Sequence, residues 1–88
     1  MSKPTRLKFK KFLKAIRHFA EEKFARFNEI NSSGSAIRFE VFIKQDDEVP
    51  HEMWTVHRDD VVWTIDLKKT YENLCVSKED FLKVANEM

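Results

Sequence analysis

Residues 9–30, FKKFLKAIRHFAEEKFARFNEI, carry apolar side chains at the three- and four-residue spacing of an α-helix. The apolar residues that share one side of such a helix are Phe9, Phe12, Leu13, Ile16, Phe19, Ala20, Phe24, Phe27 and Ile30. The pattern predicts an amphipathic helix of roughly seven turns, with an apolar stripe wide enough to cover a globular core. Pro4 suits its first turn, Thr5 is a candidate cap, and the sequence NSSGS at 31–35 is expected to end it.

Two segments with strand periodicity follow this helix. In residues 36–44, AIRFEVFIK, apolar and polar residues alternate, which predicts a strand with one buried face. Residues 52–67, EMWTVHRDDVVWTIDL, predict a β-hairpin whose loop is either 59–60 or 57–60. In both registers Trp54 and Val56 share the core face with Val61, Trp63 and Ile65. Met53, Thr55, His57, Val62, Thr64 and Asp66 then lie on the opposite face.

The last helix has the clearest start signal in the chain. Ser77 is placed as an N-cap and Asp80 three residues later, while Val76 and Phe81 occupy the positions of a hydrophobic staple. The helix is expected to turn Phe81, Val84, Ala85 and Met88 toward the core. Residues 68–74, KKTYENL, are expected to form a loop or one short helical turn.

These elements predict an α+β fold in the order α-β-β-β-α, as a single domain over residues 1–88. A three-stranded antiparallel sheet would carry the long N-terminal helix and the short C-terminal helix on one face. This order is similar to that of the double-stranded RNA-binding domain, with "VPH" at 49–51 and "SK" at 77–78 resembling that family's loop histidine and second-helix start. Lys78-Glu79-Asp80 replaces the family's basic cluster and its turn glycines are absent. The resemblance therefore implies an order of elements and not a function.

Composition indicates a soluble, cytoplasmic protein. A single cysteine, Cys75, excludes an internal disulfide and fits a reducing compartment. No run of 18 apolar residues is present, and the basic N-terminus is not followed by the apolar segment of a secretory signal.

The net charge of +1 conceals an asymmetry along the chain. Residues 1–26 hold nine Lys and Arg against two Glu, whereas residues 27–88 hold seven Lys and Arg against thirteen acidic residues. Cations at a helix N-terminus oppose the helix dipole, so their presence needs a reason. Two explanations stay open: the basic helix neutralises the acidic remainder within the fold, or it meets an anionic partner.

Two candidate binding surfaces follow from this fold. Helices on one face of the sheet leave the other open, and its predicted partner-binding residues are Phe42, Lys44, Met53, His57 and Val62. The predicted anion-binding residues of the helix are Lys8, Lys10, Lys11, Lys14 and Arg17. The first hypothesis is a non-catalytic binding protein, a regulator, inhibitor or adaptor, with a protein partner or a homodimer on the open sheet face. The alternative is a nucleic-acid-binding protein whose basic helix contacts phosphates.

No catalytic residue, metal site or cofactor is expected. Cys75 lies between Leu74 and Val76, a context that predicts a buried, inert thiol. The pair of His57 and Asp59 leaves a hydrolase as a third hypothesis. The Phe-rich and Lys-rich sides of the N-terminal helix also match a helix that lies on a membrane surface, although that would remove the cover of the sheet.

Overall fold

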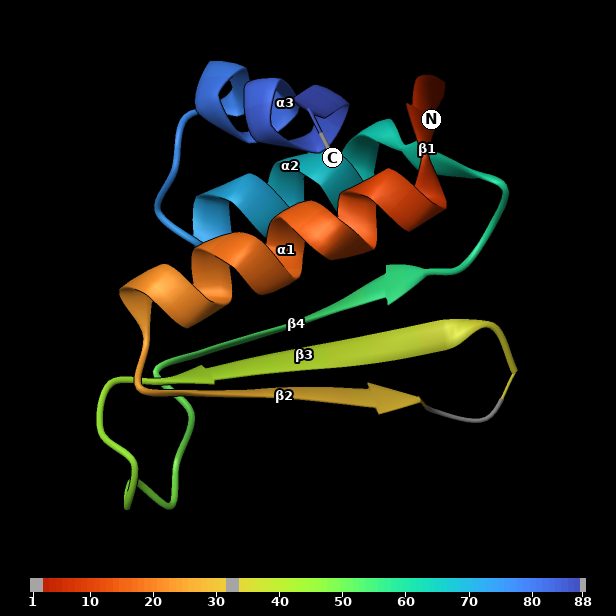
Figure 1. The fold of residues 1–88 in the computed structure, drawn as a ribbon. Coiled ribbons are helices and arrows are strands. Elements are labelled where there is room, and N and C mark those ends of the chain that lie inside the picture. The colour runs from red at the N-terminus through yellow and green to blue at the C-terminus, as the bar shows by residue number, and fades with distance from the viewer. Residues whose placement is uncertain (1–2, 32–33, 88) are drawn as a thin grey trace.

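The computed structural model of the chain describes residues 3–31 and 34–87 (Figure 1). In chain order the elements are β1 (Pro4–Lys8), α1 (Phe9–Lys23), β2 (Arg26–Asn31), β3 (Ala36–Phe42), β4 (Glu52–His57), β5 (Val61–Trp63), α2 (Thr64–Asn73) and α3 (Lys78–Glu87). The expected α+β class and its three-stranded antiparallel sheet are confirmed, with the strand order β2-β3-β4. Strands β1 and β5 pair with each other in a separate two-stranded sheet.

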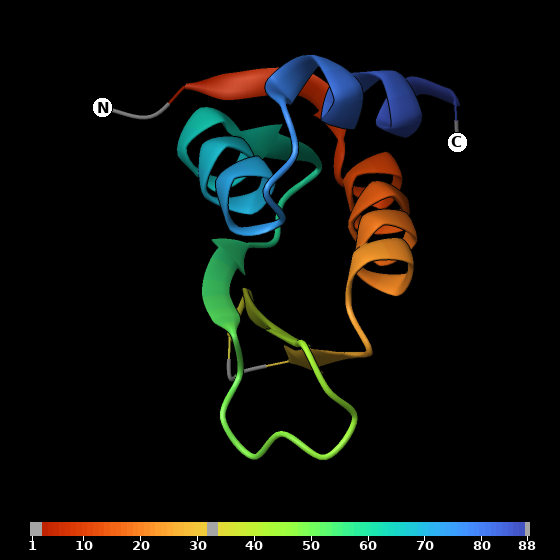
Figure 2. The same cartoon turned by 90° about the vertical axis from the view of Figure 1, so that its left-hand side faces the viewer.

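All three helices lie on the same side of the three-stranded sheet (Figure 1). Seen from the side, α1 and α2 form the layer above the sheet, and β1 and α3 lie above that layer (Figure 2). Helix α3 packs mainly on α1 and α2. The loop of residues 43–51 extends from the opposite side of the sheet (Figure 2).

The predicted N-terminal helix is wrong at both ends. Residues 4–8, which include Pro4 and Thr5, form β1 instead of the first turn, and the Thr5 hydroxyl donates to the Val62 carbonyl at 2.6 Å. Helix α1 ends at Lys23, and the chain then becomes β2. Phe27 and Ile30 are three residues apart, so they fit a helix, but on the strand they lie on opposite faces. Pairing with β2 gives β3 a second strand partner. The hydrogen bonds and packing of this pairing outweigh the helical spacing of residues 24–30.

The predicted hairpin of residues 52–67 is also wrong. Strand β4 pairs with β3, whereas β5 pairs with β1 and leads directly into α2. Helix α2 therefore occupies residues that were expected to be strand, followed by a loop or one short helical turn. The spacing of Leu67, Thr70, Tyr71 and Leu74 is helical and was the signal for it. Three of these four side chains are buried and Tyr71 is half-buried.

The C-terminal helix is confirmed at its predicted start. The amide of Asp80 donates to the Ser77 hydroxyl at 3.1 Å, as an N-cap requires. Phe81 is fully buried, with its ring 5.8 Å from both Phe12 and Phe19. Ala85 is buried and Val84 half-buried, while the prediction for Met88 lies outside the described residues. Aromatic contacts of this kind join α3 to α1 and anchor the upper layer of the molecule.

Helix α2 covers the outer edge of β4. The β4 backbone amide of His57 donates to the Asp66 carboxylate at 2.9 Å, and the Thr55 carbonyl accepts from the Lys69 ammonium at 3.3 Å. Below these contacts, the indole N–H of Trp54 donates to the buried Thr70 hydroxyl at 3.0 Å. Polar side chains of α2 thus satisfy strand groups that have no further strand beside them.

Candidate functional site

The open sheet face does not present the apolar patch that was expected. Phe42 is only 2% exposed, and the guanidinium of Arg26 lies 3.8 Å from its ring centroid. Arg26 donates to the carbonyls of Gln45 at 2.7 Å and Asp47 at 3.0 Å, which holds the loop in place. Val62 is fully buried, because it belongs to β5 and not to this sheet. The prediction of both residues as partner-binding is therefore wrong.

Lys44, Met53 and His57, the other three predicted residues, are exposed. Met53 is 53% exposed and lies on the open side of β4. Polar side chains surround it on that face. Arg38 pairs with Glu40 at 3.6 Å, and Glu40 also accepts from the Asn28 amide at 3.3 Å. The open face is thus mainly polar.

The predicted basic residues lie at the junction of β1 and α1. Lys8 ends β1, and Lys10, Lys11, Lys14 and Arg17 follow on α1. All are exposed except Lys11, which is half-buried. The structure brings four of the five onto one helix and adds Lys8 immediately before it.

Arg17 differs from the other predicted basic residues because it has an acidic partner. Its guanidinium donates twice to the Glu29 carboxylate, at 3.0 and 3.1 Å, across the space between α1 and β2. These hydrogen bonds raise the pKa of Arg17 above its ordinary value. Glu29 lies on the covered face of the sheet, opposite Phe39. For Arg17, therefore, the first of the two explanations applies: its positive charge is neutralised within the fold, by Glu29.

The remaining cations of residues 1–26 fall into two groups. Lys23 donates to the Cys75 carbonyl at 2.8 Å, and Arg26 holds the loop of residues 43–51. The side chains of the other six form no ion pair or hydrogen bond with the described residues. We call these six the N-terminal basic face: Lys3, Arg6, Lys8, Lys10, Lys11 and Lys14.

The N-terminal basic face extends over two elements. On β1, Arg6 and Lys8 are exposed and alternate with the buried Leu7, so both cations point outward. The first turn of α1 contains no acidic residue, and Lys8 provides no side-chain cap. Helix-terminal N–H groups and ammonium groups therefore add to the same positive potential. Lys3 and Arg6 were not among the predicted residues; the alternation in PTRLK was the signal for Arg6.

One cluster of acidic residues lies far from this face, whereas Asp60 lies beside it, because the Phe9 amide donates to the Asp60 carbonyl at 3.1 Å and Lys8 pairs with Val61. Asp46, Asp47 and Glu48 lie in the loop of residues 43–51, on the opposite side of the sheet from α1. Figure 2 places β1 and this loop at opposite ends of the molecule. This acidic cluster is thus held away from the N-terminal basic face in the folded molecule.

The residues considered for catalysis do not form an enclosed site. The Ser35 hydroxyl lies 3.2 Å from the His57 ring nitrogens, but both side chains are exposed. The Asp59 carboxylate accepts from the Asp60 amide at 2.7 Å and the Trp63 indole at 3.1 Å, and these hydrogen bonds lower its pKa. Cys75 is exposed, contrary to the expectation of a buried thiol. Within residues 3–31 and 34–87, no three His, Cys, Asp or Glu side chains gather as a metal site would require.

Comparison of the chain with protein-family models, with curated proteins and with solved structures found no match. The observed order, β1-α1-β2-β3-β4-β5-α2-α3, differs from the α-β-β-β-α order on which the resemblance to the double-stranded RNA-binding domain rested. Among the described residues, no helix has the length and apolar character needed to cross a membrane.

Proposed function

We propose that this chain is a small non-catalytic binding protein that holds a nucleic acid on its N-terminal basic face. The observation that supports this proposal is the lack of internal partners for six neighbouring cations, whereas Arg17, Lys23 and Arg26 are each engaged within the fold. Neutralising phosphates releases bound counterions, and this is the main source of affinity for such a surface.

Lys10 and Lys14 form the centre of the proposed contact. They lie about one helical turn apart, four residues or about 6 Å along the axis, on the exposed side of α1. Ammonium groups at this spacing can contact successive phosphates of one strand. Contacts of this kind position a nucleic acid without reading its bases, so binding is expected to depend strongly on salt and weakly on sequence.

The test measures the fluorescence anisotropy of labelled 20-nucleotide single-stranded and double-stranded DNA and RNA during titration with the protein. The double variant Lys10→Glu/Lys14→Glu is expected to lose most of the affinity at low salt. The slope of log K against log salt should fall by about 0.9 for each phosphate contact removed on a duplex. Both residues are exposed, so the fold should be retained, which circular dichroism can confirm.

The matched control is Lys44→Glu/Lys83→Glu, which changes the net charge equally at exposed sites outside the N-terminal basic face. This control should bind within about twofold of the unmodified protein. Equal losses in both double variants would show that only the net charge matters. That result would overturn the proposal, as would the absence of binding at low salt.

A second candidate function is the binding of a protein partner at the loop of residues 43–51. Three of the large apolar side chains that remain exposed lie there or next to it: Ile43 at 51%, Val49 at 77% and Met53 at 53%. Exposed apolar residues beside the acidic Asp46–Glu48 segment favour a partner with apolar and basic side chains. A partner held at this site should be lost on Val49→Asp/Met53→Asp and retained on Lys10→Glu/Lys14→Glu.

A further inference from the structure

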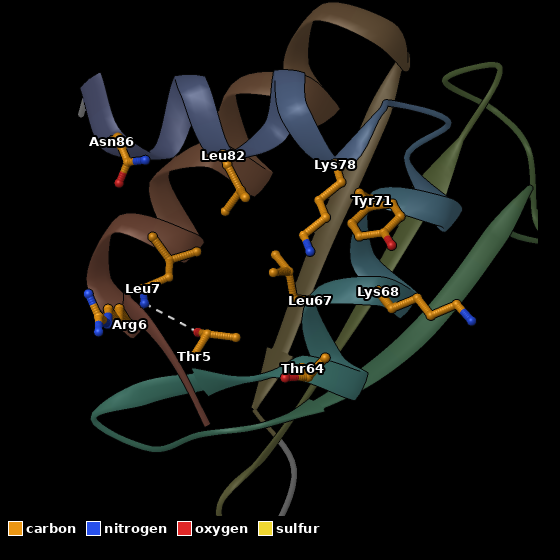
Figure 3. Close-up of a pocket in the computed structure, with 10 residues that line it drawn as sticks. All are labelled: Thr5, Arg6, Leu7, Thr64, Leu67, Lys68, Tyr71, Lys78, Leu82 and Asn86. Atoms are coloured by element: carbon orange, nitrogen blue, oxygen red, sulfur yellow. Dashed lines mark hydrogen bonds between the residues drawn. The ribbon is translucent and has the colours of Figure 1, made fainter. Parts of the chain in front are cut away.

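A cavity of about 400 Å³ lies between β1, α2 and α3 (Figure 3). Its size is within the range of small-molecule binding sites in proteins. It is separate from the open sheet face and from the loop of residues 43–51. Three elements far apart in the sequence build it, so no local motif could have predicted it.

Apolar side chains form much of the cavity wall. Leu7 of β1 and Leu67 of α2 are buried, with 6% and 4% of their surface exposed. Tyr71 of α2 and Leu82 of α3 are half-buried and complete an apolar lining. This lining favours the apolar body of a ligand, because water gains little from contact with it.

The charged side chains that line the cavity are all positive. The hydroxyl hydrogens of Thr5 and Thr64 already donate to the carbonyls of Val62 and Lys3. Three lining residues are cations, namely Arg6, Lys68 and Lys78, and no acidic residue is among the described residues that line the cavity. Cations without a nearby carboxylate favour an anionic group and disfavour an ammonium group.

Lys78 is the cation best placed to meet a ligand. In Figure 3 its side chain extends from α3 toward the middle of the cavity, whereas the side chain of Lys68 points away. No described carboxylate or carbonyl accepts a hydrogen bond from the Lys78 ammonium, so it is available to a ligand.

We propose that this cavity binds a small amphipathic anion, with a compact apolar body against Leu67, Tyr71 and Leu82 and a carboxylate or phosphate group on Lys78. The inference is independent of nucleic-acid binding, which is centred on Lys10 and Lys14 of α1, although Arg6 belongs to both the N-terminal basic face and the cavity lining. Charge complementarity selects this class of ligand: an apolar lining accepts the body, and a lysine over that lining accepts the charge.

The test titrates the ¹⁵N-labelled protein with 2-naphthoate, 2-naphthyl phosphate and the neutral 2-naphthylmethanol, followed by amide chemical shifts. We expect one or both anions to shift the amides of Leu67, Tyr71 and Leu82 and to bind at least about tenfold more tightly than the alcohol. The tighter anion identifies the preferred head group. If the alcohol binds as well as both anions, or if the shifts map to other surfaces, the inference is overturned.

The variant Lys78→Met keeps the length of the side chain and removes its charge, and Lys83→Met makes the same change on α3 outside the cavity. The first should weaken binding of the anions about tenfold and the second should leave it unchanged. Equal effects would refute a role for Lys78. Neither variant touches Lys10 or Lys14, so loss of anion binding and loss of nucleic-acid binding are separable results.

Discussion

Cys75 has the only positive φ of a non-glycine residue in the described chain, at 59°. It follows the end of α2, where its amide donates to the Glu72 carbonyl at 3.1 Å and the next amide, of Val76, donates to the Tyr71 carbonyl at 3.0 Å. This pair of hydrogen bonds is the Schellman motif, and its left-handed position is usually occupied by glycine. The exposed thiol is therefore explained by a turn that the helix needs, and no reaction has to be invoked.

Cys75→Gly is expected to stabilise the protein. Glycine removes roughly 1–2 kcal/mol of steric cost in the left-handed conformation and adds roughly 0.5–1 kcal/mol of chain entropy on unfolding. The net gain should be about 0.5–1 kcal/mol in the free energy of unfolding, measured by urea denaturation. Cys75→Ala also removes the thiol but keeps the Cβ atom, so it should show no such gain; an equal gain in both variants would contradict the backbone explanation.

The pKa of Asp59 depends on the two hydrogen bonds that its carboxylate accepts. The Asp60 amide and then the Trp63 indole hold its pKa below the ordinary value of 3.8. Because the folded-state pKa is the lower one, the resulting stabilisation is complete above the unfolded pKa. It is lost as the pH falls through the folded pKa.

Trp63→Phe should move the pKa of Asp59 upward, toward its ordinary value, because the indole donor is lost. The measurement is an NMR titration of the Asp59 carboxyl carbon in both proteins below pH 5. Trp63→Phe should also be less stable than the unmodified protein, for two reasons. The part of this stability difference that comes from the Asp59 hydrogen bond should disappear in acid, whereas the part that comes from lost apolar contact should persist at every pH. A titration of Asp59 at or above 3.8 in the unmodified protein would refute this account.

At the scale of elements, a buried polar contact joins α2 to β4 of the three-stranded sheet. The Thr70 hydroxyl accepts from the Trp54 indole at 3.0 Å and donates to the Asp66 carbonyl at 2.8 Å. Thr70 is fully buried and Trp54 is 5% exposed. Burial of this kind is tolerated only while each polar group keeps its partner.

Thr70→Val should destabilise the protein by about 1–3 kcal/mol, because the buried indole N–H loses its acceptor. Thr70→Ser keeps the hydroxyl and should cost less, which separates the hydrogen bond from packing. Thermal or urea unfolding measures both variants. In a Trp54→Phe background, which has no indole donor, the cost of Thr70→Val should shrink; an unchanged cost would assign the effect to packing alone.

Elements with strong local signals could be predicted from the sequence, and elements defined by their partners could not. The Ser77 cap and the alternation of β3 depend on neighbouring residues, and both are confirmed. Strand β2 exists because β3 lies beside it, and β5 pairs with a strand more than fifty residues away. Residues 27–30 have helical spacing and no strand alternation, so only the pairing with β3 defines this strand.

At the scale of the whole molecule, the parts of the candidate surfaces that depend on neighbouring residues could be predicted, and the parts that depend on distant residues could not. Exposure of Lys8, Lys10 and Lys14 could be predicted, because it needs only the polar side of a helix and of the strand before it. Burial of Phe42 could not, since the Arg26 side chain that lies over its ring comes from β2 and is held by carbonyls of a separate loop. The cavity at Lys78 is formed by three separate elements, so no local sequence pattern predicts it.

Helix α2 covers the β4 edge of the three-stranded sheet, so the two edges of this sheet differ. Backbone groups of β4 are already satisfied by Asp66 and Lys69, whereas β2, at the other border, has no strand beyond it in the described chain. A further strand can therefore be added to this sheet at only one edge, along β2 (Arg26–Asn31). Strand addition to this three-stranded sheet would therefore join two copies through β2 and stop at a pair, because within the described chain the sheet has one uncovered edge.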